Sequence, residues 1–223
     1  TDKENIPALH SHLPEAMAFD LDDKQLLEQQ LKKASVVLIG SGLVDDERGE
    51  ELLHTVFHHL EQNQTLILDG GALSILAKTE MKFPKVHLVL TPHQREWQVL
   101  SGLDLTSQGT EETGEALKRF PKGTILVQKG PATRIWQAGQ ADCYQLSVGG
   151  PYQATGGMGD TLAGMVAGFA GQFPQASLYE RVTVATHLHS AIAQELAEDN
   201  YVVLPTMISQ HIPAFMKNIQ KDT

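Results

Sequence analysis

The chain has 223 residues, of which 41% are apolar and 20% are charged, and its formal net charge is −10. This composition excludes a disordered chain and is sufficient for one globular domain with a sizeable core. The excess of acidic residues, without any cluster of Lys or Arg, argues against nucleic acid and anionic membranes as partners. The lone cysteine, Cys143, excludes an intrachain disulfide and favours a cytoplasmic location.

The first part of the chain alternates between two kinds of segment. Short runs rich in β-branched and aliphatic residues are predicted strands, at residues 35–39, 65–68, 86–90 and 124–127. The segments around them are predicted helices, at residues 24–33, 47–62, 72–77, 93–100 and 111–120. This alternation predicts a central, mainly parallel sheet in a three-layer α/β/α fold.

The second part of the chain has a different pattern of predicted elements. Residues 133–137 and 143–146 predict an antiparallel β hairpin at one end of the sheet, and three further helices are expected at residues 160–171, 178–197 and 207–219. We see no internal repeat, so a single domain over residues 1–223 is the simplest prediction. The chain opens with Thr1 rather than Met, and we expect further residues upstream.

The segment Gly156–Gly168, GGMGDTLAGMVAG, carries the strongest functional signal. Its glycines let the backbone approach a ligand closely, and the free N–H groups of a helix start favour phosphate. Asp160 follows at that helix start, where its carboxylate is a candidate functional group. The alternative is that Asp160 only caps the helix. The segment is neither a P-loop nor the dinucleotide fingerprint, because the Lys-Ser/Thr ending and the preceding βαβ strand are missing. Gly164 and Gly168 follow Asp160 at a helical spacing of four residues, and they would leave a smooth face on which another helix could pack closely.

Several motifs recur in the order known from one family. They are GSGL at 40–43, LDGGAL at 68–73, TPHQREW at 91–97, QKGPAT at 128–133, GGMGD at 156–160 and HLHSAIA at 187–193. GGMGD resembles the GxGD signature of the ribokinase-like superfamily. The ordered set, from about Asn5 to the C-terminus, resembles the NAD(P)H-hydrate dehydratases within that superfamily.

The resemblance implies roles for matching positions. Asp160 would be the catalytic base and would contact the substrate, together with Gly42 and His93. Glu96 would lie near a metal ion. The nucleotide would be bound by Lys129, Gly130, Pro131, Ala132, Thr133, Gly157 and Gly159.

Plainer readings remain open for several of these positions. His93 could be a residue that starts a helix after Pro92, and Glu96 could be a solvated acid in the first helical turn. Asp69 could hold water or Mg²⁺, or cap the following helix. Residues 129–133 could form an ordinary turn at the end of a strand.

The family's reaction is a repair of damaged cofactor. The resemblance implies nucleotide-dependent dehydration of (6S)-hydrated NADH or NADPH, with phosphorylation of the ring hydroxyl and elimination of phosphate. It further implies ADP rather than ATP as the co-substrate, Mg²⁺ as cofactor, and a homo-oligomer, often a homotetramer. Two alternatives remain: a ribokinase-like kinase such as hydroxymethylpyrimidine or hydroxyethylthiazole kinase, and a nucleotide-binding protein without turnover.

The chain departs from the family's pattern in four places. An N-terminal strand–helix segment that helps to enclose the substrate is not in the sequence. Gly71 replaces an acid in LDADAL, Gly150 stands where Asn is common, and Met158 replaces the Thr of GTGD. We expect the last change to remove one hydrogen bond to phosphate.

Overall fold

The structure is a computed structural model that describes residues 1–221, so the last two residues of the predicted domain, 222 and 223, lie outside the described residues. Its described residues form a six-stranded sheet in the order β1-β2-β3-β4-β5-β6. The strands are β1 (Val36–Ile39), β2 (Thr65–Leu68), β3 (His87–Leu90), β4 (Ile125–Gln128), β5 (Arg134–Gln137) and β6 (Cys143–Gln145). Strands β1 to β4 are parallel, and β5 and β6 are antiparallel. The mainly parallel sheet with a terminal hairpin is therefore confirmed.

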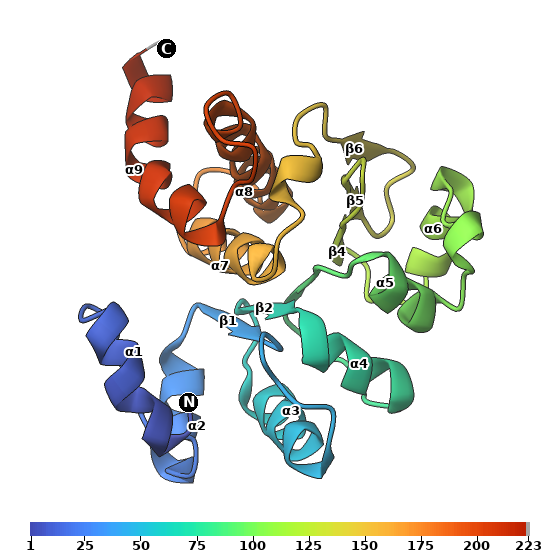
Figure 1. Ribbon diagram of the computed structural model, residues 1–223. Helices are drawn as coiled ribbons and strands as arrows, with labels where there is room; N and C mark the ends of the chain where they lie inside the picture. Colours follow the sequence, from blue (N-terminus) through green and yellow to red (C-terminus); the bar gives the residue numbers. More distant parts are fainter. Residues whose placement is uncertain (222–223) are drawn as a thin grey trace.

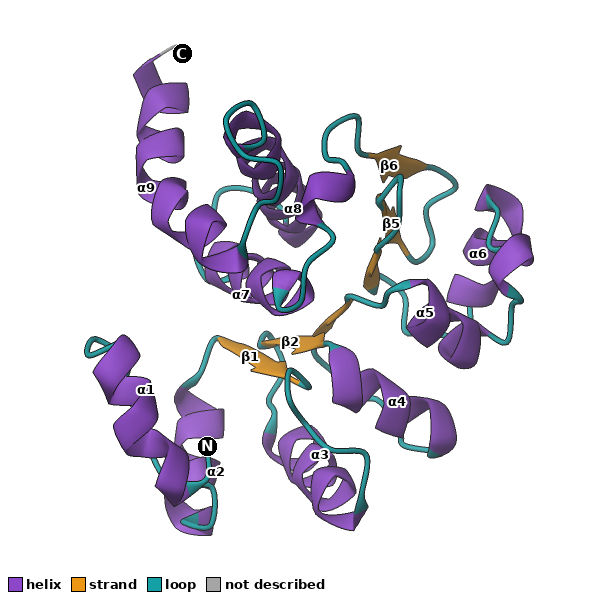
Figure 2. Cartoon of the chain, viewed as in Figure 1, coloured by secondary structure: helices purple, strands orange, loops and turns teal. Residues whose placement is uncertain are grey.

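Helices cover both faces of this sheet (Figure 1). One layer holds α7 (Met158–Ala170), α8 (Leu178–Leu196) and α9 (Pro205–Lys221). The other holds α2 (Lys24–Lys33), α3 (Glu47–His59), α4 (Gly70–Lys78), α5 (Gln94–Ser101) and α6 (Thr110–Leu117). The colouring by secondary structure shows the sheet between these two layers (Figure 2). The predicted three-layer α/β/α architecture is confirmed.

The central strands are buried on both faces of the sheet, which explains why their sequences are continuous apolar runs. All four residues of β2 and of β4 are buried. Ile67 packs into the core beneath α7 and α8, whereas its neighbours Leu66 and Leu68 face the core beneath the other helices. A parallel strand covered on both faces has no solvent side, so alternation between polar and apolar residues is lost.

Element boundaries differ from the predicted ones by a few residues. Helix α7 begins at Met158 instead of residue 160, because Gly157 takes a left-handed conformation and serves as the N-cap. Helix α3 ends at His59, three residues early, where the backbone of Leu60 is extended. A short helix, α1 (Ile6–His12), was not predicted. No helix in the described part of the chain is long and apolar enough to cross a membrane.

Candidate functional site

The predicted site residues gather where the carboxyl ends of the parallel strands meet. Gly42 lies in the loop after β1, Asp69 directly follows β2, and His93 and Lys129 follow β3 and β4. Residues 93 and 129 continue the strand pairing as an isolated parallel bridge, and the Lys129 N–H donates to the carbonyl of Pro92 at 2.9 Å. This edge is the usual ligand site of an open α/β sheet.

The start of α7 presents a free carboxylate beside free backbone donors. Gly157 is the N-cap and has a φ of 80°, so Asp160 is the third residue of the helix and lies in its first turn. The reading of Asp160 as the N-cap is therefore wrong. The N–H groups of Gly159 and Asp160 have no acceptor within the described residues, and the Asp160 side chain is exposed and has no hydrogen-bond or ion-pair partner there. Such a helix start favours an anion.

Lys129 reaches from the end of β4 to this helix start. Its ammonium nitrogen lies 3.3 Å from the position that a Cβ on Gly159 would occupy. It also forms an ion pair with Asp69, with 2.9 Å between Nζ and Oδ1. The structure thus brings Lys129 and Gly159 together, as the predicted nucleotide site requires.

Asp69 is a buried acid, with 3% of its surface exposed. The hydroxyl of Thr91 donates to its Oδ1 at 2.7 Å, next to the Lys129 ammonium. Asp69 is the N-cap residue of α4, but its side chain makes no capping hydrogen bond, so the prediction that the side chain caps this helix is wrong. The carboxylate is already neutralised by a lysine.

His93 and Glu96 form a capping box at the start of α5. The Glu96 N–H donates to Nδ1 of His93 at 3.0 Å, and the His93 N–H donates to Oε2 of Glu96 at 2.7 Å. His93 thus is the helix-start residue of the plainer interpretation. Glu96 lies in the first helical turn as expected, but its side chain is 15% exposed and caps the helix, so the description of it as a solvated acid is wrong. The side chain of His93 is 56% exposed, and its Nε2 can contact a ligand. The nearest acidic oxygen to this nitrogen is Oε1 of Glu96, at 3.6 Å.

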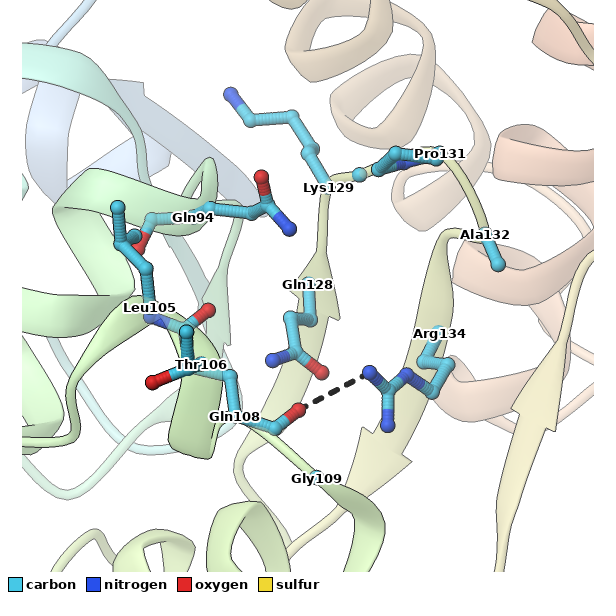
Figure 3. A pocket seen from close by; sticks show the side chains of 11 residues that line it. Gln94, Leu105, Thr106, Gln108, Gly109, Gln128, Lys129, Pro131, Ala132 and Arg134 are labelled. Atoms are coloured by element: carbon cyan, nitrogen blue, oxygen red, sulfur yellow. Dashed lines mark hydrogen bonds between the residues drawn. The ribbon is translucent and has the colours of Figure 1, made fainter.

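Residues 129–133 form the exposed turn between β4 and β5. The hydroxyl of Thr133 lies 3.4 Å from the N–H of Gly130 and 3.3 Å from its carbonyl oxygen, which closes the turn. The turn borders a cavity of about 360 Å³ that sequence reasoning did not predict. Figure 3 shows the Lys129 side chain pointing away from this cavity, and it shows Arg134 donating to the carbonyl of Gln108, a bond of 3.0 Å.

Gly42 occupies an open position at the same edge of the sheet. Its φ is 72°, and a Cβ built on it meets nothing within 4 Å. No hydrogen bond within the described chain joins it to the other candidate residues. The neighbouring Gly71 is constrained instead, because a Cβ there would lie 1.9 Å from the carbonyl oxygen of Leu43. A side chain at position 71 would therefore clash with the loop after β1.

Met158 and His189 lie on the buried side of the α7 turn. Met158 belongs to the core and is 7% exposed, so the exchange of Thr for Met places an apolar side chain in the core. His189, on α8, is 4% exposed. Burial is the main cause that lowers its pKa to about 4, with a contribution from the Lys129 charge, while an interaction with the Met158 backbone acts in the opposite direction. His189 is therefore neutral at pH 7, a role that the sequence analysis missed.

The described residues contain no group of three or more His, Cys, Asp or Glu side chains suited to a metal ion. Mg²⁺ often uses only one or two carboxylates together with substrate phosphates, so this does not conflict with a nucleotide-borne ion. Asp69 is bound by Lys129, whereas Glu96 keeps Oε1 without a close donor. Glu96 therefore fits the role better than Asp69.

Comparison with known proteins gives consistent matches. A family model described as NAD(P)H-hydrate dehydratase matches residues 1–214. The ADP-dependent (S)-NAD(P)H-hydrate dehydratase of Streptococcus pneumoniae is 70% identical over 219 residues, which cover 98% of this chain and 76% of that protein.

Two solved structures share the fold. A ribokinase-like superfamily protein from Enterococcus faecalis has a TM-score of 0.89 and 39% identity, over 98% of this chain and 75% of that one. The ADP/ATP-dependent NAD(P)H-hydrate dehydratase from Bacillus subtilis, co-crystallized with ATP/Mg²⁺, has a TM-score of 0.79 and 26% identity. The match covers 98% of this chain and 77% of that one.

The sheet order, the two helical layers and the glycine-rich helix start define a ribokinase-like enzyme fold. Within that class, the chain belongs to the NAD(P)H-hydrate dehydratase family.

Proposed function

We propose that this chain dehydrates (6S)-hydrated NADH and NADPH with ADP as the co-substrate, and thereby restores the reduced cofactor. The observation that carries the proposal is the exposed, unpaired carboxylate of Asp160 beside the free N–H groups at the start of α7. A base must reach a substrate proton, and phosphate must be held nearby. Family membership supplies the reaction, and this arrangement supplies the groups that it needs.

The phosphates of the nucleotide bind at the start of α7. Gly159 lets the Lys129 ammonium lie directly over the helix backbone, where a Cβ would be in the way. The ammonium and the helix N–H groups both attract phosphate oxygens. In the turn that follows Lys129, Gly130, Ala132 and Thr133 add backbone N–H donors, whereas Pro131 has no N–H and only restricts the turn. Gly157 supplies the left-handed residue that exposes the helix start.

Asp160 accepts the proton of the ring hydroxyl while the β-phosphoryl group of ADP is transferred to that oxygen. AMP leaves with the electron pair of the broken P–O bond. Phosphate is a better leaving group than hydroxide, so the lone pair of the ring nitrogen then expels it, and loss of a ring proton restores the double bond. The products are the reduced nicotinamide cofactor, AMP and phosphate.

The hydrated ring lies at the carboxyl ends of β1 and β3. Gly42 offers an open backbone without a side chain, and His93 offers Nε2 from an exposed ring whose orientation is fixed by the capping box. A ring held in one orientation can contact the substrate without first being ordered.

Mg²⁺ would be held by Glu96 together with nucleotide phosphates, and it would offset the negative charge of the transferring phosphoryl group. The structure of the B. subtilis enzyme, which was co-crystallized with ATP/Mg²⁺, supports this part of the proposal. ADP is preferred to ATP in our proposal because the S. pneumoniae relative is named as ADP-dependent.

A homotetramer and a cytoplasmic location remain predictions that follow from the family resemblance and from the lone cysteine. The molecular mass in solution, measured by light scattering, tests the first. Four chains of 24.4 kDa are expected per particle.

The test of the function is direct. The chain is incubated with hydrated NADH and ADP, and the absorbance of reduced nicotinamide is followed, with AMP and phosphate measured in parallel. We expect all three products in equal amounts, and none without nucleotide. If ADP binds but neither ADP nor ATP supports recovery of NADH, the proposal is wrong.

A further inference from the structure

The Asp69 carboxylate joins the carboxyl ends of four neighbouring parallel strands. It follows β2 directly, and its partners come from the loops after the other three strands. These are the Thr91 hydroxyl at 2.7 Å, the Lys129 ammonium at 2.9 Å and the Ser41 hydroxyl at 3.4 Å. A single buried side chain thus connects the ends of β1, β2, β3 and β4.

The ion pair with Lys129 is shielded from solvent. The side chain of Lys129 is 18% exposed and that of Asp69 is 4% exposed. A charged group at this depth requires a partner, because removing an ion from water is costly. Without the carboxylate, the flexible lysine side chain would gain by turning toward water.

Asp69 holds the Lys129 ammonium beside the helix start at which we propose that phosphate binds. Nζ of Lys129 lies 3.3 Å from the Cβ position of Gly159, over the first turn of α7. The N–H groups of Gly159 and Asp160 in that turn have no acceptor within the described residues. One anion could therefore contact both the ammonium and the helix start.

We propose that Asp69 is a positioning residue, which holds the Lys129 ammonium over the start of α7 before the nucleotide binds. The inference rests on the proposed role of Lys129 in nucleotide binding. A lysine side chain that is ordered in advance loses less conformational freedom when phosphate arrives. Asp69 thus acts on the nucleotide through Lys129 and does not touch it.

The test is a double-mutant cycle on ADP affinity, measured by calorimetry with Asp69→Asn, Lys129→Met and the double variant. We expect each single variant to weaken ADP binding by about tenfold, as one lost charge-assisted contact does. The double variant should be no weaker than Lys129→Met, because Asp69 acts only through that lysine. In Asp69→Asn the KM for ADP should rise while kcat at saturating ADP stays near wild type.

Two further variants keep the test decisive. Glu115→Gln removes the acid of an exposed ion pair with Lys118 on α6, and it should leave ADP affinity unchanged. Thr91→Val retains the Asp69 charge but removes its 2.7 Å hydrogen bond. If Asp69→Asn fails to fold, Thr91→Val should still weaken ADP binding in the wild type and not in the Lys129→Met background.

The outcomes separate this inference from the proposed function. If Lys129→Met weakens ADP binding but Asp69→Asn and Thr91→Val lower only the melting temperature, Asp69 is purely structural and the inference is wrong. Additive losses in the double variant also contradict it. If ADP binds the wild type and Lys129→Met binds equally well, the nucleotide role of Lys129 fails, and the inference fails with it.

Discussion

Asp160 differs from the other acids near the site in having no partner. Asp69 is neutralised by Lys129, and Glu96 caps the start of α5. Asp160 is exposed and makes no hydrogen bond or ion pair with the rest of the described chain. A carboxylate that is free and lies beside backbone donors can accept a proton from a bound alcohol. This contrast is the residue-level basis for assigning it the role of base.

Two glycines of α7 allow a matched comparison. Gly159→Ala should weaken ADP binding by about threefold, since its Cβ would lie 3.3 Å from Nζ of Lys129 and shift the ammonium slightly away from the helix start. Gly164→Ala should leave ADP affinity unchanged, because a Cβ there meets nothing within 4 Å. It should raise the free energy of unfolding by about 0.5–1 kcal/mol. Wild-type affinity in Gly159→Ala would contradict the proposed placement of Lys129.

His189 makes the stability of the fold depend on pH. Its pKa is lowered to about 4 in the native protein from 6.5, mainly by burial. Between these values the unfolded chain binds a proton that the native protein does not, so the stability that this residue contributes is complete above about pH 6.5 and is lost as the pH falls toward 4. The loss should approach roughly 3 kcal/mol.

Urea unfolding of the wild type and of His189→Gln, at pH 7.5 and at pH 4.5, measures this effect. The wild type should lose clearly more stability than the variant between the two conditions. An equal loss in both proteins would show that another group is responsible.

Sequence reasoning identified the chemistry of the site residues better than their partners. Asp160 was predicted as a functional residue from its place after a run of glycines, and as the base from the resemblance of GGMGD to the GxGD signature. The pair of Asp69 and Lys129, separated by 60 positions, was not predicted. Its formation depends on the order and register of β2, β3 and β4, which a single sequence does not specify. An acid directly after a buried strand was the one available signal.

The elements themselves were largely predictable, since most helices have a clear periodicity and the central strands are short, continuous apolar runs. Helix α2 and strand β2 have the predicted bounds. The start of α7 was misplaced because a glycine with positive φ caps the helix without a side-chain signature. The glycines at 164 and 168 remain exposed beside α9, and no helix of the described part of the chain comes within 4 Å of a Cβ built on either glycine.

The capping box of α5 allows the structural and metal-binding roles of Glu96 to be separated. Glu96→Gln keeps an oxygen that can accept from the His93 N–H, so stability should remain near wild type. Glu96→Ala removes that acceptor and should lower the free energy of unfolding by about 1 kcal/mol. Because only the charged side chain favours Mg²⁺, Glu96→Gln should require more Mg²⁺ for half-maximal turnover. An unchanged Mg²⁺ requirement would leave Glu96 with the capping role alone.

The whole molecule is organised around the shared sheet. One core lies between the sheet and α7, α8 and α9, and the other lies between the sheet and α2 to α6. Adjacent residues of one strand, such as Leu66 and Ile67, belong to opposite cores, so neither core can be lost without disturbing the other. This supports the proposal of a single domain.

Unfolding should therefore occur in one transition. Trp97 and Trp136 lie in the core beneath α2 to α6, and their fluorescence reports on that side. Circular dichroism at helical wavelengths reports on both layers. The two signals should give coincident denaturant midpoints. Separate midpoints would indicate two independently folding units.

The most direct test of the account compares wild type with Asp160→Asn in two measurements on the same samples. Turnover of hydrated NADH with ADP should fall by at least about 10²-fold, the effect expected from loss of a general base. ADP affinity, measured by calorimetry, should change little. Full turnover in Asp160→Asn would contradict the proposed proton transfer.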